Sequence, residues 1–405
     1  MKRNLFSTLQ KHLEKKEFTI LIGARQTGKS TLLKQLDKDC RQSGFPAVFL
    51  NLENKSILME LNRSPLAIFH FLPETEQRIF VFIDEIQYLE DPSNFLKLLY
   101  DEHVNKLKIV ATGSSAFYID RNFKDSLAGR KRVFTLYPCS FDEYLLLREK
   151  TELLGELNRL LRQEGAKSTQ MPILEVEWNN YILYGGYPAV ISEPDVEEKK
   201  QRLNEIKDSF VRRDILESGV RNEAAFYSLF RILADQTGGM LNLNELSNTL
   251  RIKAETVENY IFILQKCFHI ALVKPFYRNL RKELTKMPKV YLFDTGLRNC
   301  LLNNFERLSI RSDRGTLWEN AYFHILLNTY PQDDIFYWRT SAGNEVDFVL
   351  PNIQNPYAIE VKYDESAIKE SKYKLFSENY PEIPLYYTYL NPFTERVFSL
   401  KIGKT

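Results

Sequence analysis

The segment that most constrains this chain is residues 18–34, which read FTILIGARQTGKSTLLK. An apolar run leads into a loop with a glycine near each end, and the loop leads into a run of helix-forming residues. The loop fits the pattern G-x-x-x-x-G-K-[ST] at every defined position, from Gly23 to Ser30. The segment therefore predicts a buried strand, a phosphate-binding loop and a helix, in that order.

The residue types in this loop suit phosphate. Its glycines let successive backbone N–H groups point inward, and the helix that follows adds the positive end of its dipole. Lys29 is expected to reach the β- and γ-phosphates of a nucleotide, and Ser30 to offer its hydroxyl to Mg²⁺. A glycine-rich turn without a ligand is the alternative interpretation. The residues predicted to bind the nucleotide are Gly23, Ala24, Arg25, Gln26, Thr27, Gly28, Lys29, Ser30 and Thr31.

Two acidic residues form the second chemical signal. Asp84 and Glu85 follow the apolar run 79–83, and the carboxyl ends of buried strands are where α/β sheets bind ligands. Asp84 is predicted to bind Mg²⁺, directly or through water, and Glu85 to polarise the water that attacks the γ-phosphate. Such a pair is more often only a strand end that meets solvent. The phosphate loop earlier in the chain favours the catalytic interpretation.

Further candidates follow the apolar run 107–111. Thr112 and Ser114 carry hydroxyls that could sense the γ-phosphate or hold the attacking water, although capping of the next helix is the alternative. Arg130 lies in the basic stretch 121–132. It is predicted to stabilise charge on the transferred phosphoryl group, in its own subunit or in a neighbour's. A solvated basic loop is the competing interpretation.

Composition sets the broad class. A chain of 405 residues with 44% hydrophobic and 27% charged residues predicts a globular protein of two to four domains. The net charge of +2 neither requires nor excludes nucleic acid. The four cysteines lack metal-ligand spacing and predict reduced thiols in a cytoplasmic protein. The N-terminal residues do not read as a signal peptide, and we expect no membrane-spanning helix.

Residues 138–218 are rich in helix formers, and residues 219–289 contain three compact helical runs followed by a strand and the basic segment 274–289. This order is typical of a helix-turn-helix with a basic hairpin, which is a winged helix. The alternative is a docking or lever domain, because Glu255 and Glu258 lie near the start of the third run. The residues predicted to contact DNA phosphates are Lys274, Arg278, Arg281, Lys282 and Lys286.

The last third of the chain carries another constellation. Glu360 and Lys362 are two residues apart on a predicted strand, so they share one face. Pairing with the preceding strand can bring Asp347 beside Glu360, and Glu319 lies on a predicted helix. Carboxylates and an ammonium group buried together must be paired with one another or joined by a cation. We predict that Asp347 and Glu360 bind a divalent cation, Mg²⁺ or Mn²⁺. A salt-bridge network of Glu360 and Lys362 without a metal is the alternative.

The order of motifs resembles the AAA-like ATPases of the additional-strand, catalytic-glutamate division. It is more similar to a bacterial and archaeal family in which a C-terminal domain of unknown function follows the ATPase. The resemblance spans most of the chain, and only the ATPase motifs carry an assigned chemistry. The segments that carry it are GARQTGKST, FIDEIQ, ATGSS, LAGR, LYPCSFDEY, GGYPAVI at 185–191 and RRDILE at 212–217.

The constellation of Glu319, Asp347, Glu360 and Lys362 resembles the active site of PD-(D/E)xK nucleases such as Holliday-junction resolvases. The resemblance implies that the carboxylates hold one or two metal ions and that the lysine steadies a water or the developing charge. A nuclease fold that has lost its activity and binds a partner is the alternative.

We therefore expect an α/β protein with four parts. These are a P-loop AAA-like ATPase domain at 1–137, a helical lid and linker at 138–218, a winged-helix-like domain at 219–289 and a nuclease-like α/β domain at 290–405. The expected function is Mg²⁺-dependent ATP hydrolysis coupled to action on nucleic acid, with a homo-oligomer as a candidate state. The alternative is a nucleotide-controlled switch whose C-terminal domain only binds a partner.

Overall fold

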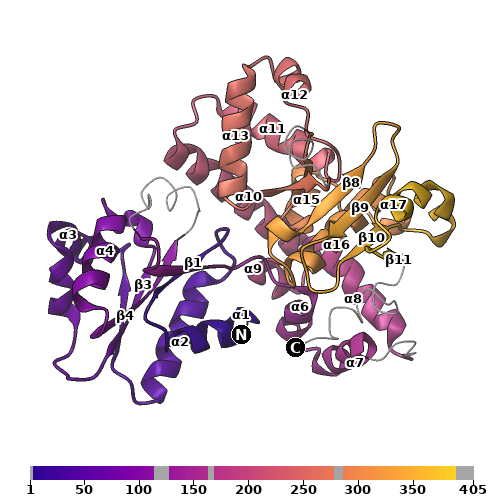
Figure 1. Ribbon diagram of the computed structural model, residues 1–405. Helices are drawn as coiled ribbons and strands as arrows, with labels where there is room; N and C mark the ends of the chain where they lie inside the picture. The colour runs from indigo at the N-terminus through magenta and orange to yellow at the C-terminus, as the bar shows by residue number, and fades with distance from the viewer. Residues whose placement is uncertain (1–2, 114–126, 163–167, 278–285, 389–405) are drawn as a thin grey trace. The chain divides into compact units, whose positions relative to one another are not determined.

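The computed structural model describes residues 3–113, 127–162, 168–277 and 286–388. The chain divides into two compact units, coloured along the sequence in Figure 1. The first comprises residues 1–138 with the short segment 266–268, and the second comprises 139–265 and 269–405.

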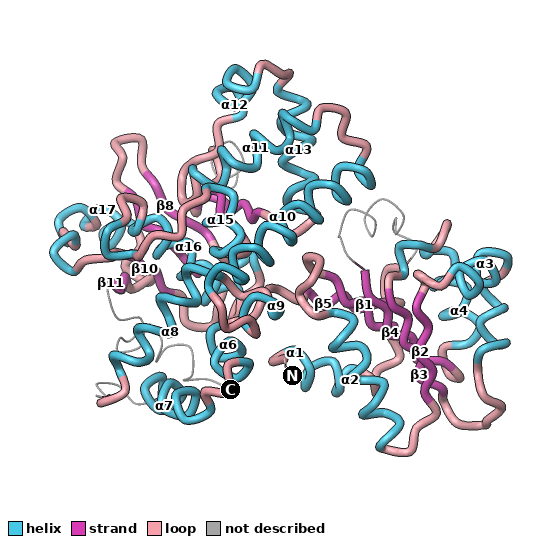
Figure 2. Tube along the Cα trace, turned by 180° about the vertical axis from the view of Figure 1, so that it is seen from behind, coloured by secondary structure: helices cyan, strands magenta, loops and turns pink. Residues whose placement is uncertain are grey.

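The first unit is built on a five-stranded sheet in the order β2-β3-β4-β1-β5, and its strands are drawn in magenta in Figure 2. All of its pairings are parallel. Strands β1, β3 and β4 are buried along their whole length, as expected for apolar runs covered on both faces. The strands are β1 (Phe18–Ile22), β2 (Ala47–Asn51), β3 (Ile79–Asp84), β4 (Leu107–Gly113) and β5 (Lys131–Thr135).

Helices cover both faces of this sheet (Figure 1). The crossover from β1 to β2 runs across the sheet in one direction, and the crossovers from β2 to β3 and from β3 to β4 run in the other. Because such connections are right-handed, α2 lies on one face of the sheet and α3 and α4 lie on the other. Leu32, Leu33 and Leu36 of α2 pack against Phe82 and Val110 of the sheet. The helices are α1 (Leu5–His12), α2 (Lys29–Gln42), α3 (Lys55–Arg63) and α4 (Pro92–His103), with the 3₁₀ turns η1 (Pro65–Phe71) and η2 (Ile86–Tyr88).

The second unit begins with helices and ends with a sheet. Residues 141–218 are helical apart from short connections and the segment outside the described residues. The α-helices among the described residues of this unit are α6 (Phe141–Leu147), α7 (Thr151–Arg162), α8 (Met171–Tyr184), α9 (Pro188–Ile191), α10 (Val196–Ser218), α11 (Glu223–Asp235), α12 (Leu243–Leu250), α13 (Ala254–Lys266), α15 (Thr295–Leu302), α16 (Arg314–Leu327) and α17 (Lys374–Asn379).

A tight junction joins the end of α8 to the start of α15. The carboxylate of Asp294 accepts hydrogen bonds from the N–H groups of Gly186 and Leu297, both at 2.7 Å. A Cβ at Gly185 would lie 2.2 Å from Asp294 Oδ1, and one at Gly296 would lie 2.1 Å from the carbonyl oxygen of Tyr184. Gly185 of GGYPAVI and Gly296 therefore serve packing, because a side chain at either position would force α8 and α15 apart.

The sheet of the second unit is mixed, with strand order β11-β10-β9-β8-β6-β7. The pairs β6–β7, β8–β9 and β9–β10 are antiparallel, whereas β6–β8 and β10–β11 are parallel. The strands are β6 (Ile270–Pro275), β7 (Lys289–Leu292), β8 (Phe336–Arg339), β9 (Glu345–Leu350), β10 (Tyr357–Val361) and β11 (Leu385–Thr388).

This topology changes the domain division expected from sequence. The boundary placed between residues 289 and 290 falls inside β7. Strand β6 pairs with β8 as well as β7, so the hairpin expected to be the wing is part of the C-terminal sheet. Helices α11 to α13 lie close to the three expected runs, but they and the sheet belong to one unit. Local patterns locate strands, whereas pairing partners depend on the fold.

Helix α16 contacts β7 and β10, and its Phe323 stacks on Tyr291 of β7 with ring centroids 4.7 Å apart. Helix α17 contributes Phe376 to a second cluster with Trp338 and Val349. The sheet is thus packed between helices, and polar side chains between α16 and the sheet are removed from water. Among the helices in the described parts of the chain, none combines the length and apolar character needed to cross a bilayer.

Candidate functional site

The backbone of the phosphate loop explains its two required glycines. Gly23 has φ 149°, and a Cβ there would lie 2.1 Å from the carbonyl oxygen of Leu136. Gly28 caps the N-terminus of α2 with φ 94°. Both angles belong to the region that glycine adopts without steric cost. The loop therefore takes its shape from residues that the motif itself specifies.

Lys29 is buried within the curve of this loop. Its Nζ donates hydrogen bonds to the carbonyl oxygens of Gly23 and Ala24, both at 2.8 Å. The Thr27 hydroxyl donates to the same Ala24 oxygen at 2.8 Å. The ammonium group is therefore oriented by the backbone toward the space where a phosphate loop binds the β- and γ-phosphates.

Two residues from distant segments meet beside the loop. The Ser30 hydroxyl donates to Asp84 Oδ1 at 3.1 Å, although 54 residues separate them. Parallel pairing of β3 with β4 also brings Asp84 next to Thr112, whose hydroxyl donates to the same oxygen at 2.6 Å. Hydroxyl and carboxylate oxygens are the ligands that Mg²⁺ prefers. Ser30 and Asp84 therefore fit the metal that the motif implies.

Glu85 adopts an unusual backbone conformation, with φ 60° and ψ 52°. A glutamate in this left-handed region is uncommon and strained. Its N–H donates to Thr112 Oγ1 at 3.0 Å, and its carboxylate accepts a hydrogen bond from Gln87 Nε2. Thr112 thus links the acidic pair, and Gln87 is a contact that sequence reasoning missed. The glutamine two residues after the acidic pair in FIDEIQ was the available signal.

The remaining predicted residues of this site differ in their placement. Ser114 lies outside the described residues. Arg130 forms an ion pair with Asp101 of α4, with Nε 2.6 Å from Oδ1, and this contact lowers the pKa of Asp101. The carbonyl of Arg130 accepts from Phe18 N–H at the amino end of β1, whereas the phosphate loop follows its carboxyl end. About 16 Å of strand separates Arg130 from the loop of its own chain.

In the second unit the structure brings the four predicted residues together. Asp347 and Glu360 are buried, and the side chain of Glu319 is 15% exposed. Asp347 Oδ2 accepts from Val361 N–H at 2.9 Å, and Glu360 Oε2 accepts from Asp347 N–H at 3.2 Å. Lys362 contacts the carboxylate of Glu360 and lies 3.6 Å from Asp347 Oδ2.

A fifth residue, Lys289 of β7, lies at the centre of this cluster. Its Nζ is 3.0 Å from Glu319 Oε1, 3.4 Å from Asp347 Oδ1 and 2.5 Å from Glu345 Oε1. The side chain of Lys289 is only 1% exposed. Tyr291 donates to Glu319 at 2.6 Å. We call Lys289, Glu319, Glu345, Asp347, Glu360 and Lys362 the lysine–carboxylate cluster.

The pKa values reflect burial and mutual repulsion in the cluster. Burial, reinforced by the charge of Asp347, raises the pKa of Glu319 to about 7 and that of Glu360 to about 8. Burial acts to lower the pKa of Lys289, but the charge of Glu319 and its neighbours outweighs it, so the pKa is raised. The lysine therefore stays charged among its carboxylates.

Sequence reasoning missed Lys289, Glu345 and Tyr291. Lys289 ends the basic segment 274–289 and was therefore interpreted as part of the basic hairpin. It is also the first residue of the apolar strand KVYL, and this position was the signal that its side chain could be buried. Within the described residues, no three acidic, histidine or cysteine side chains are arranged to share a metal ion. The metal implied by the nuclease resemblance therefore does not fit these residues as they are paired.

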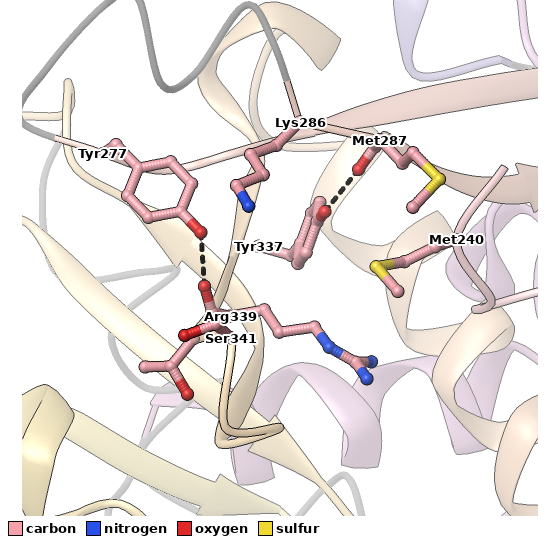
Figure 3. A pocket seen from close by; sticks show the side chains of 8 residues that line it. Met240, Tyr277, Lys286, Met287, Tyr337, Arg339 and Ser341 are labelled. Carbon is pink, nitrogen blue, oxygen red and sulfur yellow. Dashed lines mark hydrogen bonds between the residues drawn. The ribbon is translucent and has the colours of Figure 1, made fainter. Parts of the chain in front are cut away.

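The basic hairpin is only partly within the described residues. Lys274 on β6 and Lys286 before β7 are exposed, whereas Arg278, Arg281 and Lys282 lie outside the described residues. Lys286 lines a pocket of about 210 Å³ with Arg339 of β8 (Figure 3). Tyr277 and Tyr337 also line it, and their hydroxyls donate to the carbonyl oxygens of Arg339 and Met287.

Three families match separate stretches of the chain. Residues 15–145 match a family described as an AAA domain. Residues 175–308 and 314–400 match two families, each described as a domain of unknown function, DUF8612 and DUF4143 respectively. The first match covers the phosphate loop, the acidic pair and all five strands of the parallel sheet.

Similar sequences occur in bacteria and archaea. An uncharacterized protein of Mycobacterium tuberculosis is 25% identical over 364 residues, 89% of this chain and 74% of the relative. One from Haemophilus influenzae is 27% identical over 296 residues, 69% of this chain and 68% of the relative. One from Methanocaldococcus jannaschii is 24% identical over 389 residues, 90% of this chain and 79% of the relative.

Two solved structures align over much of the chain, both at a TM-score of 0.32. The replication initiator DnaA bound to AMPPCP and single-stranded DNA is 13% identical and aligns over 64% of this chain and 86% of its own. The Thermotoga maritima RuvB Holliday junction branch migration motor is 15% identical, with 69% and 91% covered. On the family match and the geometry of the phosphate loop, residues 15–145 form an AAA-type P-loop domain.

Proposed function

We propose that this protein binds ATP with Mg²⁺ and hydrolyses it. The observation that carries the proposal is the contact of Asp84 with both Ser30 and Thr112, immediately before Glu85. Three separate segments of the chain supply these groups, and all of them lie at the carboxyl edge of the parallel sheet, beside the phosphate loop.

The residues have distinct roles in this reaction. Lys29 and the N–H groups of the loop bind the phosphates. Ser30 and Asp84 would hold Mg²⁺, which would neutralise negative charge on the phosphates. Glu85 accepts a proton from the water whose oxygen bonds to the γ-phosphorus as the bond to the leaving ADP breaks. Thr112 orients both acidic residues through its hydrogen bonds.

Nucleotide binding by two lysine variants tests the proposal. Lys29→Ala should abolish both the binding of a fluorescent ATP analogue and phosphate release, because the ammonium group inside the loop is lost. Lys34→Ala, on the exposed face of the same helix, should leave both unchanged and serves as the matched control. Equal hydrolysis by the Lys29→Ala variant and the parent chain would contradict the proposal.

We further propose that Arg130 acts across a subunit interface of a homo-oligomer. Its distance from the loop of its own chain leaves only a neighbour's nucleotide within reach, and an AAA-type arginine can act in this way. Mixing an Arg130→Ala chain with a Lys29→Ala chain should restore hydrolysis that neither has alone. The control is Asp101→Asn, which removes the ion pair but keeps the arginine. A mixture without activity argues against this role.

We also propose that the whole chain acts on nucleic acid. In the described part of the basic hairpin, the exposed cations that could contact it are Lys274 and Lys286. The second candidate is a nucleotide-controlled switch whose C-terminal region binds a partner, and Lys289 within the acidic cluster favours it. Incubation of plasmid, linear, forked and four-way DNA with ATP and Mg²⁺ or Mn²⁺ separates them. Altered or cleaved DNA supports the first. The four cysteines are free thiols, as in proteins of the reducing cytoplasm, where we expect this protein to act.

A further inference from the structure

The lysine–carboxylate cluster belongs to the second unit, and its pairing is independent of the proposed ATPase function. An ammonium group has three N–H donors and no acceptor. Lys289 Nζ faces three carboxylates, those of Glu319, Glu345 and Asp347, at 2.5 to 3.4 Å. Its donors and charge are therefore matched by acidic partners that come from α16 and β9.

The other carboxylate of the cluster is also paired. Glu360 contacts Lys362 and accepts a hydrogen bond from Tyr373 at 2.8 Å. Arg339 adds a third cation, with Nη1 2.7 Å from Glu345 Oε2. Four carboxylates thus face three fixed cations. A divalent ion placed among them would leave an excess of positive charge in a buried site, which is costly.

The geometry also opposes a metal ion. Mg²⁺ requires oxygen ligands at about 2.1 Å in near-octahedral array, and such ligands must converge on one point. Here the point on which Glu319, Glu345 and Asp347 converge is Lys289 Nζ. The carboxylate of Asp347 is divided between two lysines, with Oδ1 toward Lys289 and Oδ2 toward Lys362.

Two residues that line the pocket of Figure 3, Tyr337 and Arg339, also contact this cluster. The ring of Tyr337 lines the pocket, and its centroid is 5.7 Å from Lys289 Nζ. Lys286 and Arg339 line the same pocket. A metal cation in this pocket would therefore lie beside two positively charged side chains.

We propose that Lys289 takes the place of the divalent cation that a PD-(D/E)xK site holds, so that the cluster binds neither Mg²⁺ nor Mn²⁺. The C-terminal region then performs no metal-dependent cleavage of nucleic acid. The carboxylates that sequence reasoning read as metal ligands instead join α16, β7, β9 and β10 through charged hydrogen bonds. Removal of Lys289 should uncover a metal site from the same carboxylates.

Mn²⁺ binding to the full chain without nucleotide tests this proposal, in an Asp84→Asn background that removes the ligand in the first unit. Electron paramagnetic resonance measures free Mn²⁺. All three tryptophans, Trp178, Trp318 and Trp338, belong to the second unit, so tryptophan fluorescence follows its melting alone. The background chain should take up no Mn²⁺, and Mn²⁺ should leave its Tm unmoved. Lys289→Ala should take up Mn²⁺ and gain several degrees of Tm from it.

Two further variants make the result specific. Asp347→Asn added to Lys289→Ala should remove the gained Mn²⁺ binding. Lys286→Ala removes an exposed lysine three positions away and should gain none. The proposal is overturned if the background chain binds Mn²⁺ that Asp347→Asn abolishes, or if a folded Lys289→Ala chain takes up no Mn²⁺. Should Lys289→Ala fail to fold, the comparison of the background chain with and without Asp347→Asn decides the question by itself.

Discussion

The protein contains two acidic sites built from the same residue types but with different partners. In the first unit, Asp84 receives hydrogen bonds from the neutral hydroxyls of Ser30 and Thr112. In the second unit, Asp347 lies between the ammonium groups of Lys289 and Lys362. The hydroxyls orient a carboxylate and leave its charge available to a cation. The ammonium groups neutralise that charge.

The comparison shows why acidic residues alone do not identify a metal site. A buried carboxylate needs a compensating charge, and the fold can supply it from the protein or from an ion. Among the contacts of the described residues, Asp84 and Glu85 are paired with no lysine. The lysine of the phosphate loop, Lys29, donates its hydrogen bonds to backbone carbonyls. The lysine–carboxylate cluster has a lysine on each side of Asp347.

The largest effect should come from Glu85→Gln. The amide keeps the shape of the side chain but cannot accept a proton from water, so turnover should fall by about 10²- to 10⁴-fold. Binding of ATP should remain, because the loop residues are unchanged. Phosphate release and equilibrium binding of a fluorescent nucleotide measure the two properties. Unchanged hydrolysis would show that Glu85 is not the base.

Removal of Lys289 should cost the second unit much of its stability. Lys289→Ala leaves three carboxylates without their shared cation, and breaking a buried pair in this way costs about 3–5 kcal/mol. Urea unfolding followed by tryptophan fluorescence measures this unit. Lys286→Ala should change the unfolding free energy little because that lysine is exposed. Equal effects of the two variants would mean that the cluster contributes no net stability.

The stability of the second unit should fall as pH rises. The folded state raises the pKa of Glu319 to about 7 and of Glu360 to about 8, from 4.5. At a pH between the unfolded and the folded pKa of each group, the native state binds more protons than the unfolded state. Each group can therefore lower the free energy of unfolding by up to about 1.4 kcal/mol per pH unit as the pH rises. Urea unfolding between pH 4.5 and about pH 8 measures the slope. Glu360→Gln should reduce it, and a slope unaffected by this change would exclude Glu360 as its source.

The smallest effect should come from the basic hairpin. If Lys274, Arg278, Arg281, Lys282 and Lys286 contact phosphates, removal of Lys274 and Lys286 should weaken DNA binding and reduce the log–log salt slope by about 0.9 per contact. Fluorescence anisotropy at several salt concentrations measures both. Replacing all five residues without any change in affinity or slope would exclude the hairpin as the DNA surface.

The accuracy of sequence reasoning differed between the two units for a physical reason. The residues from Gly23 to Ser30 are contiguous in the chain, so local backbone conformation determines the shape of the loop. The sequence therefore predicts this loop correctly. Asp84 and Thr112 end neighbouring strands of a parallel sheet, and such ends meet at one edge. The expected domain boundary after residue 289 falls inside β7 because β6 pairs with both β7 and β8. The pairing of Lys274 with Phe336, 62 residues apart, leaves no local pattern in the sequence.

The amino-acid sequence by itself determined the phosphate loop, its strand and helix, and the acidic pair, because glycine conformations and strand ends are set by neighbours along the chain. Only the tertiary structure decided the partners of the buried carboxylates. Lys289 was read from sequence with an exposed basic segment, and its charge acts at the centre of the cluster because β7 pairs with β6 beneath α16. Electrostatic interactions depend on distance and burial in space, and residues 289, 319 and 347 become neighbours only when the sheet forms.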